Sequence, residues 1–259
     1  MTSDSSSSSP LPSIIALPRG VHAIQLDAAP PLDLTPAEAA AWAAMQASNP
    51  RLHDGTFASV TDLIVPSTPD AAVIIRARRE HFARLVIEQP QQHPRLLGLK
   101  AILLGIDARA TPHVFIQRRH HQTRVYPGCW EIGPGGGLDV TGLSQHISAG
   151  ALFAHLLTEI SAEIGIDAPS LLGRALAAPP RALFAVDDTL ARSLDLCFVL
   201  PWPGVIDPTR APGDRTRKDW EATEAQWLSK AEAPRFVNAH GPHIAPPSLA
   251  ILRHKGWLA

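Results

Sequence analysis

Two stretches decide the fold of this 259-residue chain: "GPGGGLD" at residues 133–139 and "TEISAEIGI" at residues 158–166. The first is a glycine run that directly follows the strand-like segment "CWEI" and that we expect to form a turn. The second closes the longest helical pattern in the chain, over residues 145–165. Together with the strand-like segments around them, they predict a mixed sheet with helices on its faces.

The helical stretch has a broad apolar face and an acidic side. Leu156, Ile160 and Ile164 recur at helical spacing on the apolar face. Glu159 and Glu163 are four residues apart, so their carboxylates are neighbours on the helix surface. Like charges at this spacing repel mildly unless a cation lies between them, and Mg²⁺ or Mn²⁺ binds carboxylate oxygens. The pair is a candidate metal site, and a solvated helix face is the alternative interpretation.

The glycine run indicates which ligand a metal ion on this acidic helix would bind. Gly135, Gly136 and Gly137 have no side chains, which lets a phosphate group approach their backbone N–H groups closely. A metal ion held by the helix would then bridge the phosphate oxygens. We therefore expect the three glycines to bind a substrate diphosphate and Glu159 and Glu163 to hold the ion.

The two stretches resemble the Nudix hydrolase family, whose box has the form G-x5-E-x7-R-E-U-x-E-E-x-G-U, with U an aliphatic residue. Glu159 and Glu163 match two glutamates of the box, and the closing glycine–aliphatic pair is also present. Thr158 stands where the family has arginine, Ala162 replaces another glutamate, and Gly150 occupies the position of the early glutamate. The box is therefore degenerate.

The resemblance implies an α/β (α+β) fold, in which a Nudix-type mixed sheet is sandwiched between helices and carries an N-terminal β-rich extension. It implies a Nudix hydrolase domain over residues 96–259, preceded by an N-terminal β/α region over residues 13–95. Residues 1–12 contain five consecutive serines and are predicted to be a disordered tail.

A narrower similarity comes from "NPRLHDGTF" (49–57) and from "LFAHLLTEISAEIGI" (152–166), which resemble the UDP-glucose diphosphatase branch of the family. This similarity implies Mg²⁺-dependent cleavage of a nucleotide sugar such as UDP-glucose to UMP and a sugar 1-phosphate. Two alternatives stay open. The degenerate box is compatible with a weakly active or inactive nucleotide-binding module, and a diphosphatase acting on ADP-ribose, NAD(H) or coenzyme A is the other candidate.

Further candidate residues flank the two stretches. Arg118, Arg119 and Arg124 in "QRRHHQTR" have the geometry that binds phosphate bidentately, although they also fit an exposed strand end. Catalysis needs a proton acceptor, for which Glu159 itself or a late acid such as Glu224 is the candidate.

Local signals predict several elements outside the site. Thr35, Pro36 and Glu38 have the pattern of a capped helix start. The other elements that we expect are one or two strands within residues 13–26, a hairpin over 58–65 and 71–78, a short helix over 79–89, a strand over 190–202, a strand at "EAQWL" and a C-terminal helix.

Composition excludes several classes of protein. The formal net charge of −1 gives no bulk attraction for nucleic acid or acidic membranes. The partner that the resemblance implies is a small nucleotide diphosphate compound. Two cysteines cannot form a disulfide framework, and no apolar run is long enough to span a bilayer. We expect a cytoplasmic protein, and the sequence leaves its oligomeric state open.

Overall fold

The structure is a computed structural model that describes residues 12–18, 20–66, 68, 73–88, 93–173, 180–212 and 221–258. The predicted tail over residues 1–12 therefore lies outside the described residues, apart from Pro12. The strands are β1 (Ser13–Ala16), β2 (Val21–Leu26), β3 (Thr56–Ile64), β4 (Val73–His81), β5 (Leu96–Asp107), β6 (Pro112–Arg119), β7 (Trp130–Ile132), β8 (Gly135–Gly137), β9 (His146–Ser148), β10 (Phe184–Asp188), β11 (Ser193–Ile206) and β12 (Ala222–Ser229). The helices are α1 (Pro36–Ser48), α2 (Phe82–Val86), α3 (Ala149–Ile164), the π-helix η1 (Pro169–Gly173), α4 (Ala233–His240), the 3-10 helix η3 (Gly241–His243) and α5 (Pro246–His254).

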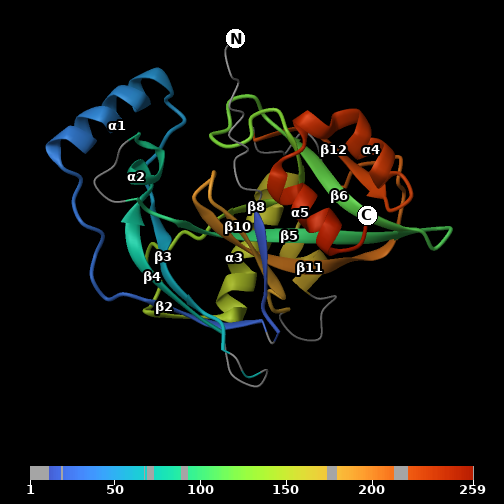
Figure 1. Cartoon of the computed structure of the whole chain (residues 1–259), viewed down its shortest axis with the longest axis horizontal. Coiled ribbons are helices and arrows are strands. Elements are labelled where there is room, and N and C mark those ends of the chain that lie inside the picture. The colour runs from blue at the N-terminus through green and yellow to red at the C-terminus, as the bar shows by residue number, and fades with distance from the viewer. Residues whose placement is uncertain are drawn as a thin grey trace, which may run out of the picture.

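These strands form a 12-stranded mixed sheet around the long strand β5. β5 pairs parallel with β11 and antiparallel with β6 and β8, and a single residue pair joins it to β3. The path continues from β3 through β4 and β2 to β9, while β12 and β7 extend the sheet from β6. Because β5 touches four neighbours, it positions the segments on which the candidate site is built (Figure 1).

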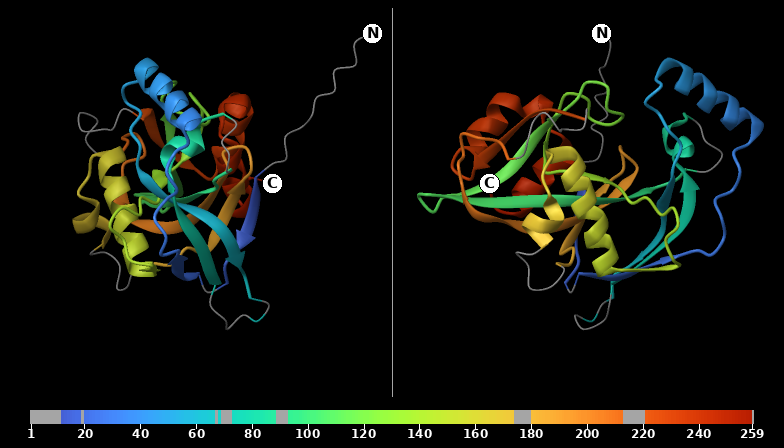
Figure 2. Two further views of the ribbon diagram at one scale, coloured as in Figure 1. Left: turned by 90° about the vertical axis from the view of Figure 1, so that its left-hand side faces the viewer. Right: turned by 180° about the vertical axis from the view of Figure 1, so that it is seen from behind.

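Helices cover both faces of this sheet. The alternate β5 residues Leu97, Leu99 and Ala101 belong to the apolar core that includes the buried face of α3. Ile102 faces the second core, which includes Ile251 of α5. Figure 2 shows α3 in front of the sheet when the molecule is viewed from behind, while Figure 1 shows α5 on the opposite side. The predicted mixed sheet sandwiched between helices is confirmed.

The N-terminal region extends the same sheet. β1 pairs with β10, β2 pairs with β9, and the predicted hairpin is present as the antiparallel pair β3 and β4. The expected capping box is confirmed, because the Thr35 side chain accepts from the Glu38 backbone N–H and the Glu38 side chain accepts from the Thr35 N–H. Whether the predicted boundary at residue 95 separates two folding units stays a prediction.

A buried ionic cluster fixes α1 to this region. The Arg84 guanidinium donates to Glu38 at 3.1 Å and to Glu80 at 2.9 Å, and all three residues are buried. Arg84 also donates to the Asp33 carbonyl at 2.7 Å. Buried charges are tolerated when each is paired and hydrogen-bonded, so this cluster sets where α1 packs.

Two local expectations were wrong. The helix expected over residues 79–89 is limited to α2, because Arg79, Glu80 and His81 continue β4 and pair with β3. The glycine run is not a turn. It forms β8, whose residues pair with Gly98, Leu99 and Lys100 of β5, so that backbone pairing overrides the general preference of glycine for turns.

Candidate functional site

Helix α3 begins and ends at residues with clear capping roles. The Ser148 side chain accepts from the Ala151 N–H at the start, and Gly165, with φ of 74°, ends the helix. Leu152, Leu156 and Ile160 of α3 lie in the core beneath the sheet. The helix is therefore fixed against the sheet, and its acidic residues are held beside β8.

The two glutamates of α3 converge on successive glycines of β8. Glu163 Oε1 accepts a hydrogen bond of 2.8 Å from the Gly135 N–H. Glu159 Oε2 lies only 2.7 Å from the position that a Cβ would occupy on Gly136. One turn earlier, His155 Nε2 lies 3.3 Å from the Gly137 carbonyl oxygen and 3.5 Å from Glu159 Oε1. The structure thus brings together the acidic pair and the glycine run that the sequence singled out.

Glu163 is the more buried of the two carboxylates. Its Oε2 accepts a 2.6 Å hydrogen bond from Gln117 Nε2 of β6, so each carboxylate oxygen has one neutral N–H donor. Burial raises the pKa of Glu163 to about 8, and the nearby Glu131 carboxylate adds to the rise. The side chain therefore has hydrogen-bond partners but little compensating positive charge.

Glu131 of β7 has the opposite environment. Its Oε2 pairs with Lys100 Nζ at 2.9 Å, and its Oε1 pairs with Arg119 Nη1 at 2.8 Å. Burial alone would raise the pKa of Glu131, but the charges of Lys100 and Arg119 outweigh it and lower the pKa. Gln117 Nε2 also approaches Glu131 Oε1, at 3.3 Å, and so links Glu131 to Glu163.

Asp195 of β11 lies beside this network. Its Oδ1 occupies the space where Gly98 lacks a side chain, 2.1 Å from the position of an added Cβ, so only glycine fits there. Burial raises the pKa of Asp195 to about 6, and the Lys100 charge opposes that rise. Lys100 therefore serves both Glu131 and Asp195 as a counter-charge.

The three predicted phosphate-binding arginines point to separate partners. Arg118 Nη1 pairs with Glu224 at 2.8 Å, and Arg119 pairs with Glu131 as described. Arg124 Nη2 donates to the Ala191 carbonyl at 3.4 Å. Glu224 is 54% exposed at the start of β12, so the predicted late acid occupies an open surface. Roles for these arginines and for Glu224 in binding and catalysis stay predictions.

Two cavities flank the network without being lined by the glycines of β8. One, of about 440 Å³, lies between Ala28, Pro30 and Pro31, Arg79 and residues 140–145. The other, of about 400 Å³, is bordered by Trp130, Pro208, Thr209, Ala211 and Glu224.

The acidic side chains available to a cation beside β8 are Glu159 and Glu163 of α3. Within the described residues, no group of three or more His, Cys, Asp or Glu side chains could hold a metal. Glu131 cannot add a third carboxylate, because Lys100 and Arg119 already neutralise it. Glu159 and Glu163 remain as neighbouring oxygen donors, and a cation beside them would relieve the raised pKa of Glu163.

Sequence reasoning missed three members of the network, Lys100, Gln117 and Asp195. Lys100 is a single cation inside the apolar run "LLGLKAILLG", and a lone charge in a buried strand signals a partner across the sheet. Gln117 likewise ends the apolar run "HVFIQ". Asp195 alternates with core residues in β11 and gives no signal of its own.

Comparison with known proteins finds similarity at the level of structure only. No family model matches the chain, and no curated protein matches it. A NUDIX hydrolase from Alicyclobacillus acidocaldarius is 18% identical with a TM-score of 0.44, over 61% of this chain and 90% of that protein. The NUDIX domain of Shewanella oneidensis NrtR, solved with ADP ribose, is 14% identical with a TM-score of 0.43, over 66% and 92%. A MutT protein from Methanosarcina mazei is 17% identical with a TM-score of 0.35, over 53% and 79%. Sequence identities and TM-scores this low do not indicate an activity. The activity is therefore inferred from the site.

Among the helices that the structure describes, none combines the length and the apolar character needed to cross a bilayer.

Proposed function

We propose that this chain is a Nudix-type diphosphohydrolase that cleaves a nucleoside diphosphate-linked compound, with a nucleotide sugar such as UDP-glucose as the candidate substrate. The observation that carries the proposal is the convergence of Glu159 and Glu163 on Gly136 and Gly135 of β8. The degenerate box supports the same assignment, because it retains both of these glutamates.

Different residues of the site would bind the diphosphate, the metal ion and the proton. β8 carries no side chains, and we place the diphosphate next to Gly136, where the adjacent protein atoms belong to the flexible Glu159 carboxylate. Glu159 and Glu163 are the residues that would hold Mg²⁺, with Mn²⁺ as the alternative, and the ion would supply charge neutralisation at the phosphate oxygens. Gln117 and the Gly135 N–H keep the Glu163 carboxylate in a fixed orientation. Glu159 is half-buried, and a carboxylate in this position can accept a proton from an attacking water.

A nucleotide-binding module without turnover is the second candidate, and one observation favours it. Both oxygens of Glu163 already accept hydrogen bonds within the protein, and Lys100 and Arg119 already neutralise the neighbouring Glu131. A chain with this internal charge balance can bind an anionic nucleotide without supporting hydrolysis.

The test is a panel of UDP-glucose, ADP-ribose, NADH and coenzyme A, incubated with and without Mg²⁺, with products identified by ³¹P NMR. We expect Mg²⁺-dependent formation of a nucleoside monophosphate from at least one compound. Glu163→Gln should abolish the reaction, while Glu88→Gln, at an exposed position after α2, should leave it unchanged. Calorimetric binding without product in the wild type would select the binding module, and full activity of Glu163→Gln would reject the assignment of this ligand.

A further inference from the structure

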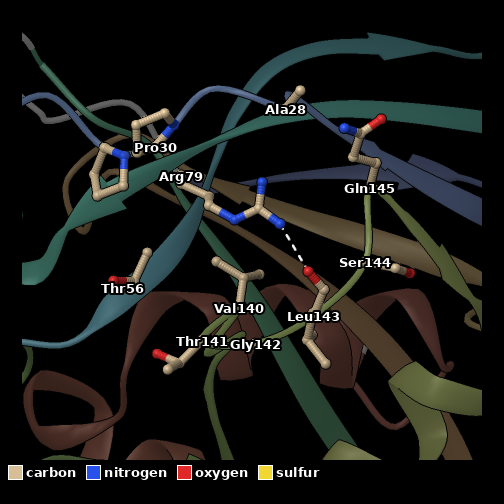
Figure 3. Close-up of a pocket in the computed structure, with 11 residues that line it drawn as sticks. Ala28, Pro30, Thr56, Arg79, Val140, Thr141, Gly142, Leu143, Ser144 and Gln145 are labelled. Carbon is tan, nitrogen blue, oxygen red and sulfur yellow. Dashed lines mark hydrogen bonds between the residues drawn. The ribbon is translucent and has the colours of Figure 1, made fainter.

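One cavity lies where the N-terminal region meets the segment that follows β8. Ala28, Pro30 and Pro31 border it on one side and residues 140–145 on the other, with Thr56 and Arg79 between them (Figure 3). Its volume of about 440 Å³ is within the range of about 300–1,000 Å³ that is usual for small-molecule sites.

Hydrogen bonds hold both walls of the cavity in place. Arg79 Nη2 donates to the Leu143 carbonyl at 2.7 Å, the contact drawn in Figure 3, and its Nη1 donates to the Asp27 carbonyl at 2.5 Å. The Leu26 N–H donates to the Gln145 carbonyl at 2.7 Å, and the Val140 N–H donates to the Thr56 carbonyl at 2.9 Å. The cavity is therefore part of the folded architecture rather than a gap between loose segments.

The backbone path of β8 leads directly to this cavity. Beyond Gly137, the Leu138 N–H donates to the Leu97 carbonyl, and Asp139 forms a bridge with Phe57. Val140 then lines the cavity, three residues after Gly137. At about 3.3 Å per extended residue, the cavity wall lies about 10 Å from the end of the glycine strand. One ligand can thus occupy both places if it joins a diphosphate to another group.

The lining identifies the chemistry of that group. Thr56, Thr141 and Ser144 offer hydroxyls and Gln145 offers an amide, while the prolines, Val140 and Leu143 give apolar surface. The Arg79 guanidinium donates to the carbonyl oxygens of Asp27 and Leu143 at the cavity wall. A guanidinium has five N–H donors, which leaves some for an acceptor oxygen of a ligand. Apolar walls with a few neutral polar groups suit an uncharged ring with a polar edge.

We propose that this cavity binds the uncharged ring, nucleobase or sugar, that is attached to the substrate diphosphate, so that the N-terminal region determines specificity. This inference rests on the proposed function for the location of the diphosphate. Pro30 and Pro31 pack against one side of the ring, and the Arg79 guanidinium faces its acceptor oxygens.

The experiment introduces a large side chain at the rim of the cavity. Thr141→Trp and Ser144→Trp replace exposed residues and leave the core intact, and Thr61→Trp, exposed on β3 outside the cavity, is the matched control. Calorimetry with Mg²⁺ measures binding of UDP-glucose, UDP, glucose 1-phosphate and inorganic pyrophosphate. We expect at least tenfold weaker binding of UDP-glucose to both rim variants, with pyrophosphate binding and the Thr61→Trp control unchanged.

Binding of UDP and of glucose 1-phosphate shows which part of the substrate occupies the cavity. Weaker binding of UDP places the base in the cavity, and weaker binding of glucose 1-phosphate with UDP unchanged places the sugar there. Unchanged binding of UDP-glucose to both rim variants overturns the cavity proposal and leaves the proposed hydrolysis standing. A wild-type chain that binds UDP-glucose but shows no turnover refutes hydrolysis while the cavity result still stands. Absence of binding of all four compounds of the hydrolysis panel to the wild type overturns both.

Discussion

Replacing Gly136 with alanine tests whether the Glu159 carboxylate has to lie against β8. The added Cβ would lie 2.7 Å from Glu159 Oε2, so the carboxylate has to move. It is the far end of a flexible, half-buried side chain and can turn away at little cost. Loss of glycine freedom in the unfolded chain stabilises by about 0.4–1 kcal/mol, so the stability should change by less than about 1 kcal/mol.

The functional effect of Gly136→Ala should be much larger. A hydrogen bond or ion contact to a charged group contributes about 1.5–3 kcal/mol. At about 1.4 kcal/mol per factor of ten, displacement of the Glu159 carboxylate should reduce Mg²⁺-dependent turnover roughly 10- to 150-fold. Hydrolysis of the best substrate is measured over a Mg²⁺ titration, and urea unfolding checks that the variant is folded.

The matched control is Gly105→Ala in β5, away from β8. Its Cβ would lie 2.7 Å from Ile206 Cγ2, the same separation, but the neighbour is a buried, stiffer β-branched side chain and no carboxylate is involved. This variant should keep the Mg²⁺ dependence of the wild type. If Gly136→Ala retains turnover within twofold of the wild type at every Mg²⁺ concentration, Glu159 has no role as a ligand.

Two further predictions concern the framework. Burial would raise the pKa of Glu38, but hydrogen bonds from Arg84 and Thr35 outweigh burial and lower it from 4.5 to about 2. The ionised carboxylate should therefore contribute up to about 3 kcal/mol above pH 4.5, lost as the pH falls from 4.5 towards 2. Urea unfolding at pH 7 and pH 3 should show this loss in the wild type and a smaller one in Glu38→Gln. The Tyr126 hydroxyl donates to Asp188 Oδ2 at 2.7 Å, so Tyr126→Phe should destabilise by about 1.5–3 kcal/mol in urea unfolding, and an unchanged midpoint would contradict this role.

Sequence reasoning succeeded where the signal is local. The capping pattern at Thr35 and Glu38 is satisfied by contacts within four residues, and it predicted the start of α1. The alternation of Leu194, Leu196 and Phe198 predicted β11, because the pleat places those side chains on one face. Neither prediction depended on distant parts of the chain.

Long-range pairing explains the failures. The glycine run has the composition of a turn, but its backbone groups find partners in β5, more than thirty residues earlier. The helix expected over residues 79–89 lost its first three residues to β4, because they pair with β3. The ion pair of Glu131 with Lys100 depends on the same sheet contacts, and no local pattern encodes it.

The distribution of charge around β8 explains why the acidic pair of α3 remains chemically available. Lys100 and Arg119 are both directed at Glu131, which leaves Glu163 with only the neutral donors Gln117 and the Gly135 N–H. Neutral donors orient a buried carboxylate but compensate its charge less than a cation does. A cation where α3 meets the glycine strand would favour the ionised form of Glu163, whose raised pKa of about 8 otherwise favours the protonated form at neutral pH. A cation would bind most favourably at that position, and a diphosphate on the same strand would bind the same cation.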